Sequence, residues 1–277
     1  MFWPTPLADY ERPPVVETVM AVHFTRLSHL SSVELLDFWR TALRTDYPVA
    51  SERAAYQVPV ELFEAPGDVM QIQMELSPSP GRVRYWFQSE SNEDLIQLQN
   101  DWLAFNWRKI DPSGKYRHFP YGVERFRRAY DDLQSYLAAA KHGAFAPRQV
   151  EVTYINHIAA QDGGWTDHAD LGLITDLVSA PREGLLPRPE MLSASARYSV
   201  HDDNGPVGRL HVEAQPQFVE AGPAYVLRLT YRGKTEGQGL DGVLVALERG
   251  HQWVVGAFDE ITTGSMHDLW GRKDRDE

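Results

Sequence analysis

A short pattern that occurs twice in this chain constrains its fold more than any other feature. Val16-Glu17, five further residues and His23-Phe24 are matched by Val150-Glu151, five further residues and His157-Ile158. Both copies follow proline and are rich in β-branched residues, which is typical of a strand that begins after a turn. Because each copy opens one half of the chain, we expect two copies of one structural unit in tandem.

Apolar periodicity predicts that each half runs strand, helix, several strands and a long helix. The first half is expected to form strands at 15–24, 56–63, 69–76, 82–89, 95–100 and 102–109, and helices that start at Ser31 or Ser32 and cover 122–141. The second half is expected to form strands at 148–159, 190–202, 207–219 and 224–234, and helices at 167–179 and 239–262. Ser31 and Glu34 have the spacing of a capping box.

The predicted fold class is therefore α+β, built from two tandem β-α-β(n)-α units. We expect the units to span 1–146 and 147–277, each with an antiparallel sheet packed on its long C-terminal helix. A short linker over 142–147 favours two units that pack together. The charged tail at 271–277 is expected to be frayed.

Composition excludes several classes of function. The 277 residues include no cysteine, which excludes disulfides, thiolate metal sites and cysteine nucleophiles. The net charge of −12 makes nucleic acid an unlikely partner, because nucleic-acid affinity depends on neutralising phosphates. The chain has neither an apolar run of membrane-spanning length nor the pattern of a signal peptide, so we expect a cytoplasmic protein that does not bind membranes.

Alternation along the strands separates an apolar face from a polar face in each half. The polar faces carry the candidate ligand-binding or partner-binding residues, namely Gln97, Gln99, Asn106 and Arg108 in the first half and Glu151, His157, Arg197, Arg209, His211, Glu213 and Arg228 in the second. One interpretation is that these faces meet water, as one side of an antiparallel sheet often does. The other is that they form a groove for a polar ligand or a partner segment.

No motif in the chain specifies a reaction, and we expect neither a metal nor a cofactor. His-x-x-x-His and His-Glu-x-x-His are both absent. His251 lies on the apolar stripe of the last helix, where a buried histidine needs a hydrogen-bond partner. Trp107 is expected in the core, whereas Trp86 and Trp102 share a side with polar residues and are expected to be partly exposed.

Several runs together resemble a sporadically distributed family of uncharacterised bacterial proteins. The runs are Pro13-Pro14-Val15-Val16-Glu17, Leu95-Ile96-Gln97-Leu98-Gln99-Asn100-Asp101, Asn106-Trp107-Arg108-Lys109, Val150-Glu151-Val152-Thr153-Tyr154-Ile155-Asn156, Gly250-His251 through Phe258, Thr262-Thr263 and Trp270. The resemblance covers nearly the whole chain and implies a bacterial protein. It implies no catalytic residues.

The lack of a catalytic pattern and the two polar faces favour a protein-binding or regulatory module with a protein partner. The alternative is a metal-independent, hydrolase-like enzyme that uses Glu, His and Arg side chains on a sheet face. Convergence of Glu151, His157, Arg197 and His211 around one pocket would favour the enzyme. Whether the protein is an enzyme stays open at this point.

Overall fold

The structure is a computed structural model that describes residues 7–57, 59–63, 83–140, 146–178 and 185–273. Its strands are β1 Val15–Phe24, β2 Val49–Ala54, β3 Val83–Gln88, β4 Asp94–Gln99, β5 Trp102–Arg108, β6 Pro147–Ala159, β7 Ala194–Asp202, β8 Gly205–Val219 and β9 Gly222–Lys234. Its helices are α1 Ser32–Phe38, α2 Phe119–Ala139, α3 Leu171–Ile174, α4 Gly239–Ile261 and α5 Gly264–Trp270, with a π-helical turn at Trp39–Leu43 and a 3₁₀ turn at Ala160–Asp162.

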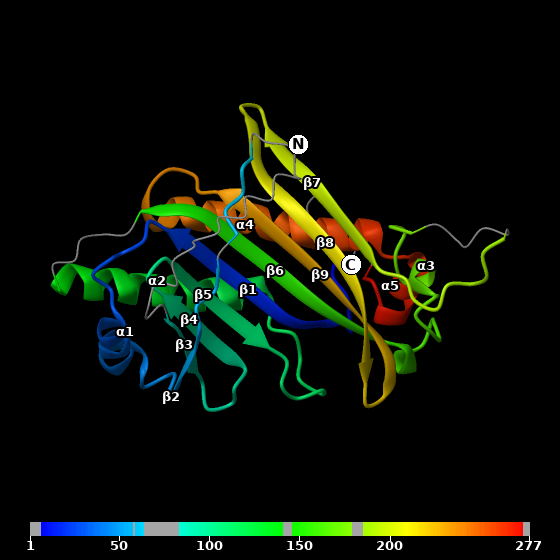
Figure 1. The fold of residues 1–277 in the computed structure, drawn as a ribbon, viewed down its shortest axis with the longest axis horizontal. Helices are drawn as coiled ribbons and strands as arrows, with labels where there is room; N and C mark the ends of the chain where they lie inside the picture. The colour runs from blue at the N-terminus through cyan, green and yellow to red at the C-terminus, as the bar shows by residue number, and fades with distance from the viewer. Residues whose placement is uncertain (1–6, 58, 64–82, 141–145, 179–184, 274–277) are drawn as a thin grey trace.

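All of these strands belong to one antiparallel sheet with the order β2-β3-β4-β5-β1-β6-β9-β8-β7 (Figure 1). The prediction of two units, each with its own sheet packed on its own C-terminal helix, is therefore wrong. β1 pairs with β5 on one side and with β6 on the other, and the register places Ala21 opposite Glu151. In separate sheets β1 and β6 would each leave a row of backbone groups unpaired, and their pairing removes both exposed edges.

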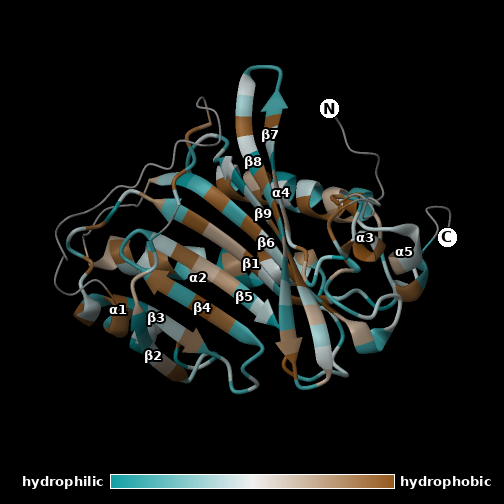
Figure 2. Cartoon of the chain, turned by 45° about the vertical axis from the view of Figure 1, so that its right-hand side comes forward, coloured by the Kyte–Doolittle hydropathy of each residue, from teal (hydrophilic) through white to brown (hydrophobic). Residues whose placement is uncertain are grey.

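The long helices α2 and α4 cover one face of this sheet (Figure 1). Hydrophilic and hydrophobic residues alternate along several strands (Figure 2). Because successive side chains of a strand point to opposite faces, such a strand presents one face to these helices. The core on this side includes Phe24, Trp107, Tyr130 and Tyr231, each at most 1% exposed. We call this side the helix face and the opposite side the polar face.

Glycine lets both long helices lie close to the sheet. A Cβ atom at Gly250 of α4 would sit 2.7 Å from Tyr231 Cδ1 and 2.8 Å from Val152 Cγ2, closer than real Cβ contacts allow. A Cβ atom at Gly122 of α2 would meet Met20 Cε at 2.5 Å. Since His251 follows Gly250, the close approach of α4 also determines where that histidine meets the sheet.

Most of the predicted elements are confirmed. The strands expected at 15–24, 82–89, 95–100, 102–109, 148–159, 190–202, 207–219 and 224–234 and the long helices at 122–141 and 239–262 correspond to observed elements within a few residues. The capping box is also present, since Ser31 and Glu34 exchange the expected hydrogen bonds at the start of α1. The helix expected at 167–179 is confined to the single turn of α3, and α5 was not predicted.

The strand predicted at 56–63 is wrong, and β2 forms instead at Val49–Ala54. Pro59 lacks a backbone N–H and cannot donate to a sheet ladder, so this stretch takes an irregular path. The strand predicted at 69–76 lies outside the described residues, as does most of the linker predicted at 142–147. At the other end of the chain, Lys273 N donates to Asp9 O at 2.9 Å, and residues 274–277 lie outside the described part.

None of the helices in the described part of the chain combines the length and the apolar character that crossing a membrane requires.

Candidate functional site

The polar face of the sheet is covered by the chain itself. Residues 55–57 and 59–63, which we call the covering segment, lie across it and contact side chains of β4, β5, β6, β8 and β9. The Tyr56 ring packs against Trp102, with ring centroids 5.1 Å apart. Trp102 is only 3% exposed, so the prediction that it is partly exposed is wrong, whereas Trp107 is confirmed in the core at 1%.

Two buried glutamines hold the backbone of the covering segment. Gln99 Oε1 accepts from Tyr56 N at 3.0 Å, and Gln99 Nε2 donates to Tyr56 O at 2.9 Å. Gln149 Oε1 accepts from Glu61 N at 2.9 Å, and its Nε2 donates to Pro59 O at 2.8 Å. Each glutamine amide thus bonds both a backbone N–H and a backbone C=O of the covering segment, as a neighbouring strand would. These backbone groups are therefore satisfied although no strand forms at 56–63.

Glu61 occupies the centre of a buried charge cluster. Its carboxylate accepts from Arg209 Nη1 at 2.5 Å, His211 Nε2 at 2.7 Å and Arg232 Nη1 at 3.2 Å. Arg232 also donates from Nε to Glu151 at 2.7 Å. Burial alone would raise the pKa of Glu61, but the hydrogen bond from His211 and the nearby positive charges lower it to about 2.

A second polar network lies on the same face in the first half of the chain. Arg84 donates to Gln97 Oε1 at 3.0 Å, Gln97 donates to Asn106 Oδ1 at 2.8 Å, and Asn106 donates to Glu17 Oε1 at 2.6 Å. Gln97 and Asn106 are 6% and 2% exposed. These residues therefore satisfy one another inside the protein, and the interpretation in which the polar face meets water does not hold for them.

The remaining candidate residues do not join one site. Glu213 and Arg228 form an exposed ion pair at 3.9 Å, and Arg108 donates to Asn92 O at 2.7 Å. Arg197 is exposed on β7. His157 lies six residues beyond Glu151 on β6, which separates their Cα atoms by about 20 Å. Glu151 and His211 are joined through Glu61 and Arg232, and Arg197 lies opposite His211 in the sheet, but His157 is remote from that cluster.

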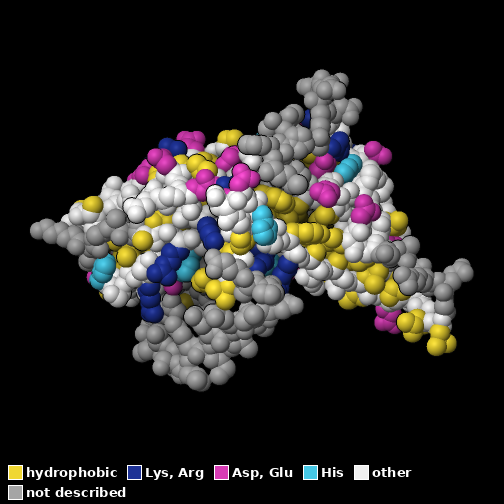
Figure 3. Space-filling model, turned by 90° about the horizontal axis from the view of Figure 1, so that it is seen from above, with side chains coloured by type: hydrophobic (Ala, Val, Ile, Leu, Met, Phe, Trp, Pro, Cys, Tyr) yellow, Lys and Arg dark blue, Asp and Glu magenta, His cyan; other side chains and the backbone are white. Residues whose placement is uncertain are grey.

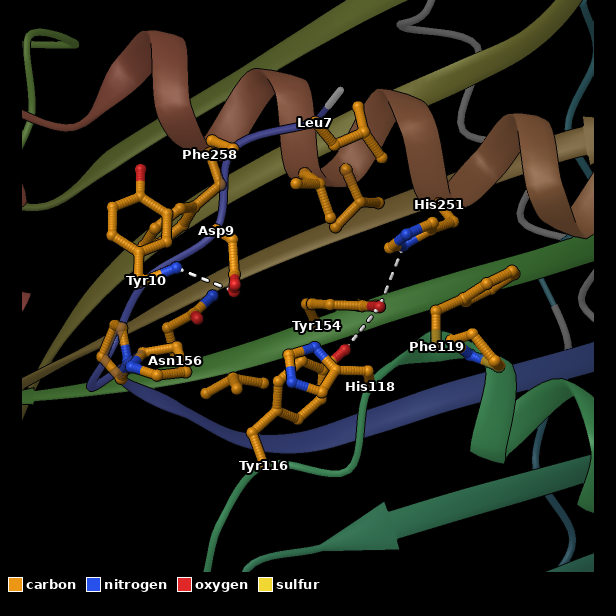
Figure 4. A pocket seen from close by; sticks show the side chains of 17 residues that line it. Leu7, Asp9, Tyr10, Tyr116, His118, Phe119, Tyr154, Asn156, His251 and Phe258 are labelled. Carbon is orange, nitrogen blue, oxygen red and sulfur yellow. Dashed lines mark hydrogen bonds between the residues drawn. The ribbon is translucent and has the colours of Figure 1, made fainter. Parts of the chain in front are cut away.

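An open cavity lies on the helix face, between α4 and the start of α2 (Figure 4). Its volume is about 260 Å³. The floor is the central strand pair, with Val15 of β1 and Tyr154 and Asn156 of β6, and α4 contributes one wall. Its lining is Leu7, Ala8, Asp9, Tyr10, Pro13, Pro14, Val15, Tyr116, His118, Phe119, Pro120, Tyr154, Asn156, His251, Val254, Val255 and Phe258.

A chain of hydrogen bonds crosses the cavity floor. Tyr116 OH donates to Tyr154 OH at 2.8 Å, and Tyr154 OH lies 3.0 Å from His251 Nδ1 (Figure 4). Since Tyr154 accepts from Tyr116, its own proton finds an acceptor at Nδ1, and in this arrangement neutral His251 carries its proton on Nε2. The hydrogen-bond partner that the sequence required for a buried histidine at this position is thus confirmed.

The surroundings keep these polar groups neutral. Burial, with the charge of nearby His118 as a smaller cause, lowers the pKa of His251 to about 4. Burial likewise raises the pKa of Tyr116 to about 12 and that of Tyr154 well above its ordinary value. The Phe119 ring stacks on the His251 imidazole at a centroid distance of 4.0 Å. At neutral pH the floor of the cavity therefore presents apolar surface and the uncharged hydrogen-bonding groups of Tyr116, Tyr154 and His251.

The carboxylates nearest the cavity are already paired. Asp9 binds Lys273 Nζ at 2.5 Å, and Asp259 binds Arg272 at 2.6 Å. Tyr10 OH donates to Asp259 at 2.8 Å and closes the end of the cavity near Phe258. Among the polar residues of the cavity, the sequence indicated a hydrogen-bonding need only for His251, whereas Asp9, Tyr10, Tyr116 and His118 come from other segments of the chain.

Comparison with known proteins finds no matching protein-family model, no matching curated protein and no matching solved structure. The resemblance to the sporadically distributed bacterial family therefore stays a prediction.

Proposed function

We propose that this protein binds a small, mostly apolar molecule in the cavity between α4 and the central strand pair. The observation that carries the proposal is the cavity itself, whose apolar and aromatic lining surrounds a few polar groups. Binding sites for small molecules have this character, with apolar walls for affinity and a few polar groups for orientation. On the polar face, by contrast, Glu61 already occupies the basic cluster.

The cost of unfilled apolar space supports a binding role for the cavity. Protein interiors are packed as densely as organic crystals, and empty apolar space lowers stability by about 24 cal/mol per Å³. A chain with no ligand at this position would gain stability from larger side chains in place of Val254 or Val255, both on α4. A ligand that enters the cavity provides the missing contacts instead.

Filling the cavity is expected to abolish binding. In Val255→Trp the indole would occupy the space that a ligand needs, so we expect binding of the neutral fluorescent probe 1-aminoanthracene to weaken by about tenfold or more. The measurement is a fluorescence titration of the folded protein. Val245→Trp is the matched control, because Val245 is 51% exposed on the same helix. A wild-type protein that does not bind the probe, or a Val255→Trp variant that binds it equally well, would refute the proposal.

A protein partner is a second proposal, and exposed apolar side chains near α3 support it. Leu173, Met191 and Phe218 are 48%, 51% and 73% exposed. Figure 3 shows hydrophobic side chains gathered toward the end of the molecule that carries α3 and α5. Exposed apolar groups of this kind favour an interface with another protein. A cytoplasmic location for both proposals stays a prediction from the sequence.

Polar substitutions at this end are expected to release the partner. A stoichiometric partner that co-purifies with the wild type should be lost from the double variant Leu173→Ser/Phe218→Ser, because the apolar contact area would be removed. Val33→Ser is the control, since Val33 is 71% exposed on α1. Quantitative mass spectrometry of the purified proteins provides the readout. Equal recovery with the double variant, or no stoichiometric partner at all, would count against this proposal.

A further inference from the structure

Asn156 brings an unused hydrogen-bond acceptor to the cavity. Its side chain is held in place because Nδ2 donates to Leu227 O at 3.1 Å, and the residue is only 3% exposed. Among the described residues none donates to Oδ1, and this oxygen is not among the fully enclosed polar atoms. Since Asn156 lines the cavity, its amide oxygen is available to a ligand there (Figure 4).

His251 brings an unused donor to the same cavity. Its Nδ1 accepts the proton of Tyr154, so the neutral ring carries N–H at Nε2. No acceptor for this N–H is found in the part of the chain that the structure describes, and the atom is not enclosed. The ring itself is held by its stack on Phe119, which gives the donor a defined direction.

The carboxylates that the structure describes at the cavity are already paired, and His118 at its rim is exposed to solvent. The Asp9 carboxylate at its rim is bound to Lys273, and that of Asp259 behind Tyr10 is bound to Arg272. An ion that left water for this lining would lose its hydration without gaining a counter-charge, which disfavours its binding. The net charge of −12 further repels anions.

We propose that the ligand is a neutral molecule with an apolar skeleton, a hydroxyl or amine that donates to Asn156 Oδ1, and a carbonyl or ether oxygen that accepts from His251 Nε2. This inference rests on the proposed function of the cavity and deepens it by naming the class of ligand. Buried polar groups select strongly for ligands that satisfy them, because an analogue without the matching group leaves them unpaired.

A set of related small molecules tests this ligand class. 4-Hydroxyacetophenone carries both required groups, acetophenone lacks the hydroxyl, 4-ethylphenol lacks the carbonyl, and 4-hydroxybenzoate adds a charge. We expect 4-hydroxyacetophenone to displace 1-aminoanthracene at concentrations about tenfold lower than each of the other three, since each lacks a hydrogen bond or loses hydration.

Variants of Asn156 and His251 test which ligand group each residue binds. Asn156→Leu is expected to abolish the preference for 4-hydroxyacetophenone over acetophenone, and His251→Phe the preference over 4-ethylphenol. Because each readout is a ratio of two affinities in one protein, a general weakening of the fold changes both values and leaves the ratio unaffected. Thr153→Val is the control, since Thr153 lies on the same strand but on the polar face, where it bonds Thr230 at 2.9 Å.

The outcomes separate this inference from the proposed function. Binding of 1-aminoanthracene with no preference among the four molecules, or with a preference for 4-hydroxybenzoate, would overturn the ligand class and leave the binding function standing. Preferences that persist in both variants would overturn the assignment to Asn156 and His251. If neither the probe nor any of the four molecules binds the wild type, the binding function itself fails.

Discussion

Replacing Glu61 by glutamine is expected to lower the free energy of unfolding by about 3–5 kcal/mol. The Glu61 carboxylate is 8% exposed and faces Arg209, His211 and Arg232. Glutamine has nearly the same shape but no charge, so Arg209 and Arg232 would stay buried without the carboxylate that faces them both. Urea unfolding of the two proteins at neutral pH measures the difference.

The control for Glu61→Gln is the same change at an exposed ion pair. Glu213 lies 3.9 Å from Arg228, and their side chains are 45% and 49% exposed. Because water screens such a pair, Glu213→Gln should change stability by at most about 1 kcal/mol. Equal losses in the two variants would contradict the view that the charge cluster under the covering segment stabilises the fold.

The charge cluster also predicts a pH dependence. The pKa of Glu61 is about 2 in the folded protein against a model-peptide value of 4.5. A carboxyl group with a depressed folded-state pKa contributes stability above pH 4.5 and loses it as the pH falls toward 2. The contribution amounts to about 3 kcal/mol, and the Glu61→Gln variant should lack this part of the acid transition.

The buried imidazole of His251 is expected to make the folded protein less stable as the pH falls from 6.5 to 4. Its pKa is about 4 in the folded protein and 6.5 for an unburied imidazole. Between these values the unfolded chain binds a proton that the folded protein does not, so stability falls as the pH decreases from 6.5 to 4. The loss reaches about 3 kcal/mol at the lower end, whereas above pH 6.5 this histidine contributes no pH dependence.

The variant His251→Gln removes this proton-binding group while it keeps an acceptor for Tyr154 OH. Its stability should therefore fall less than that of the wild type between pH 6.5 and 4, by about 3 kcal/mol in urea unfolding experiments. His29→Gln serves as the control because His29 is exposed on the surface. Parallel pH profiles for wild type and His251→Gln would show that the imidazole is not kept neutral by burial.

The local elements could be predicted because their signals are local. The capping residues of α1, the stripe of α4 and the alternation along β8 each follow from neighbours a few positions apart. The wrong strand at 56–63 shows where this reasoning stops. Its residues alternate as a strand does, but Gln99 and Gln149 bind its backbone from far along the chain.

One signal for the arrangement of the sheet was present in the sequence. β1 carries Val19 and Ala21 on the side opposite Met20 and Val22, and a strand that is apolar on both sides is covered on both faces. That pattern indicates a strand covered on both faces. It does not indicate that β6 pairs with the edge of β1 opposite β5, because strands pair through backbone groups that are the same for every residue type.

The residues of the candidate sites likewise fall into those that the sequence indicated and those that only the tertiary structure revealed. Alternation along the strands correctly placed Gln97 and Asn106 on the polar face of the first half and His211 on that of the second. Nothing in it showed that the two halves share one sheet or that Glu61 would cover its polar face. His251 was assigned to an apolar stripe with a need for a partner, and the partner proved to be Tyr154. Asn156 was not selected, because only its position on the floor of a cavity distinguishes it from other strand residues.

The sequence by itself determined most of the strands, the long helices and the side that each of those strands presents to the core, since these follow from side-chain order along a short stretch. Only the tertiary structure decided that β1 and β6 join one sheet, that residues 55–57 and 59–63 lie across its polar face and that a cavity opens above β6. The physical reason is range: periodicity acts over a few residues, whereas edge pairing, ion clusters and cavities depend on segments more than a hundred residues apart.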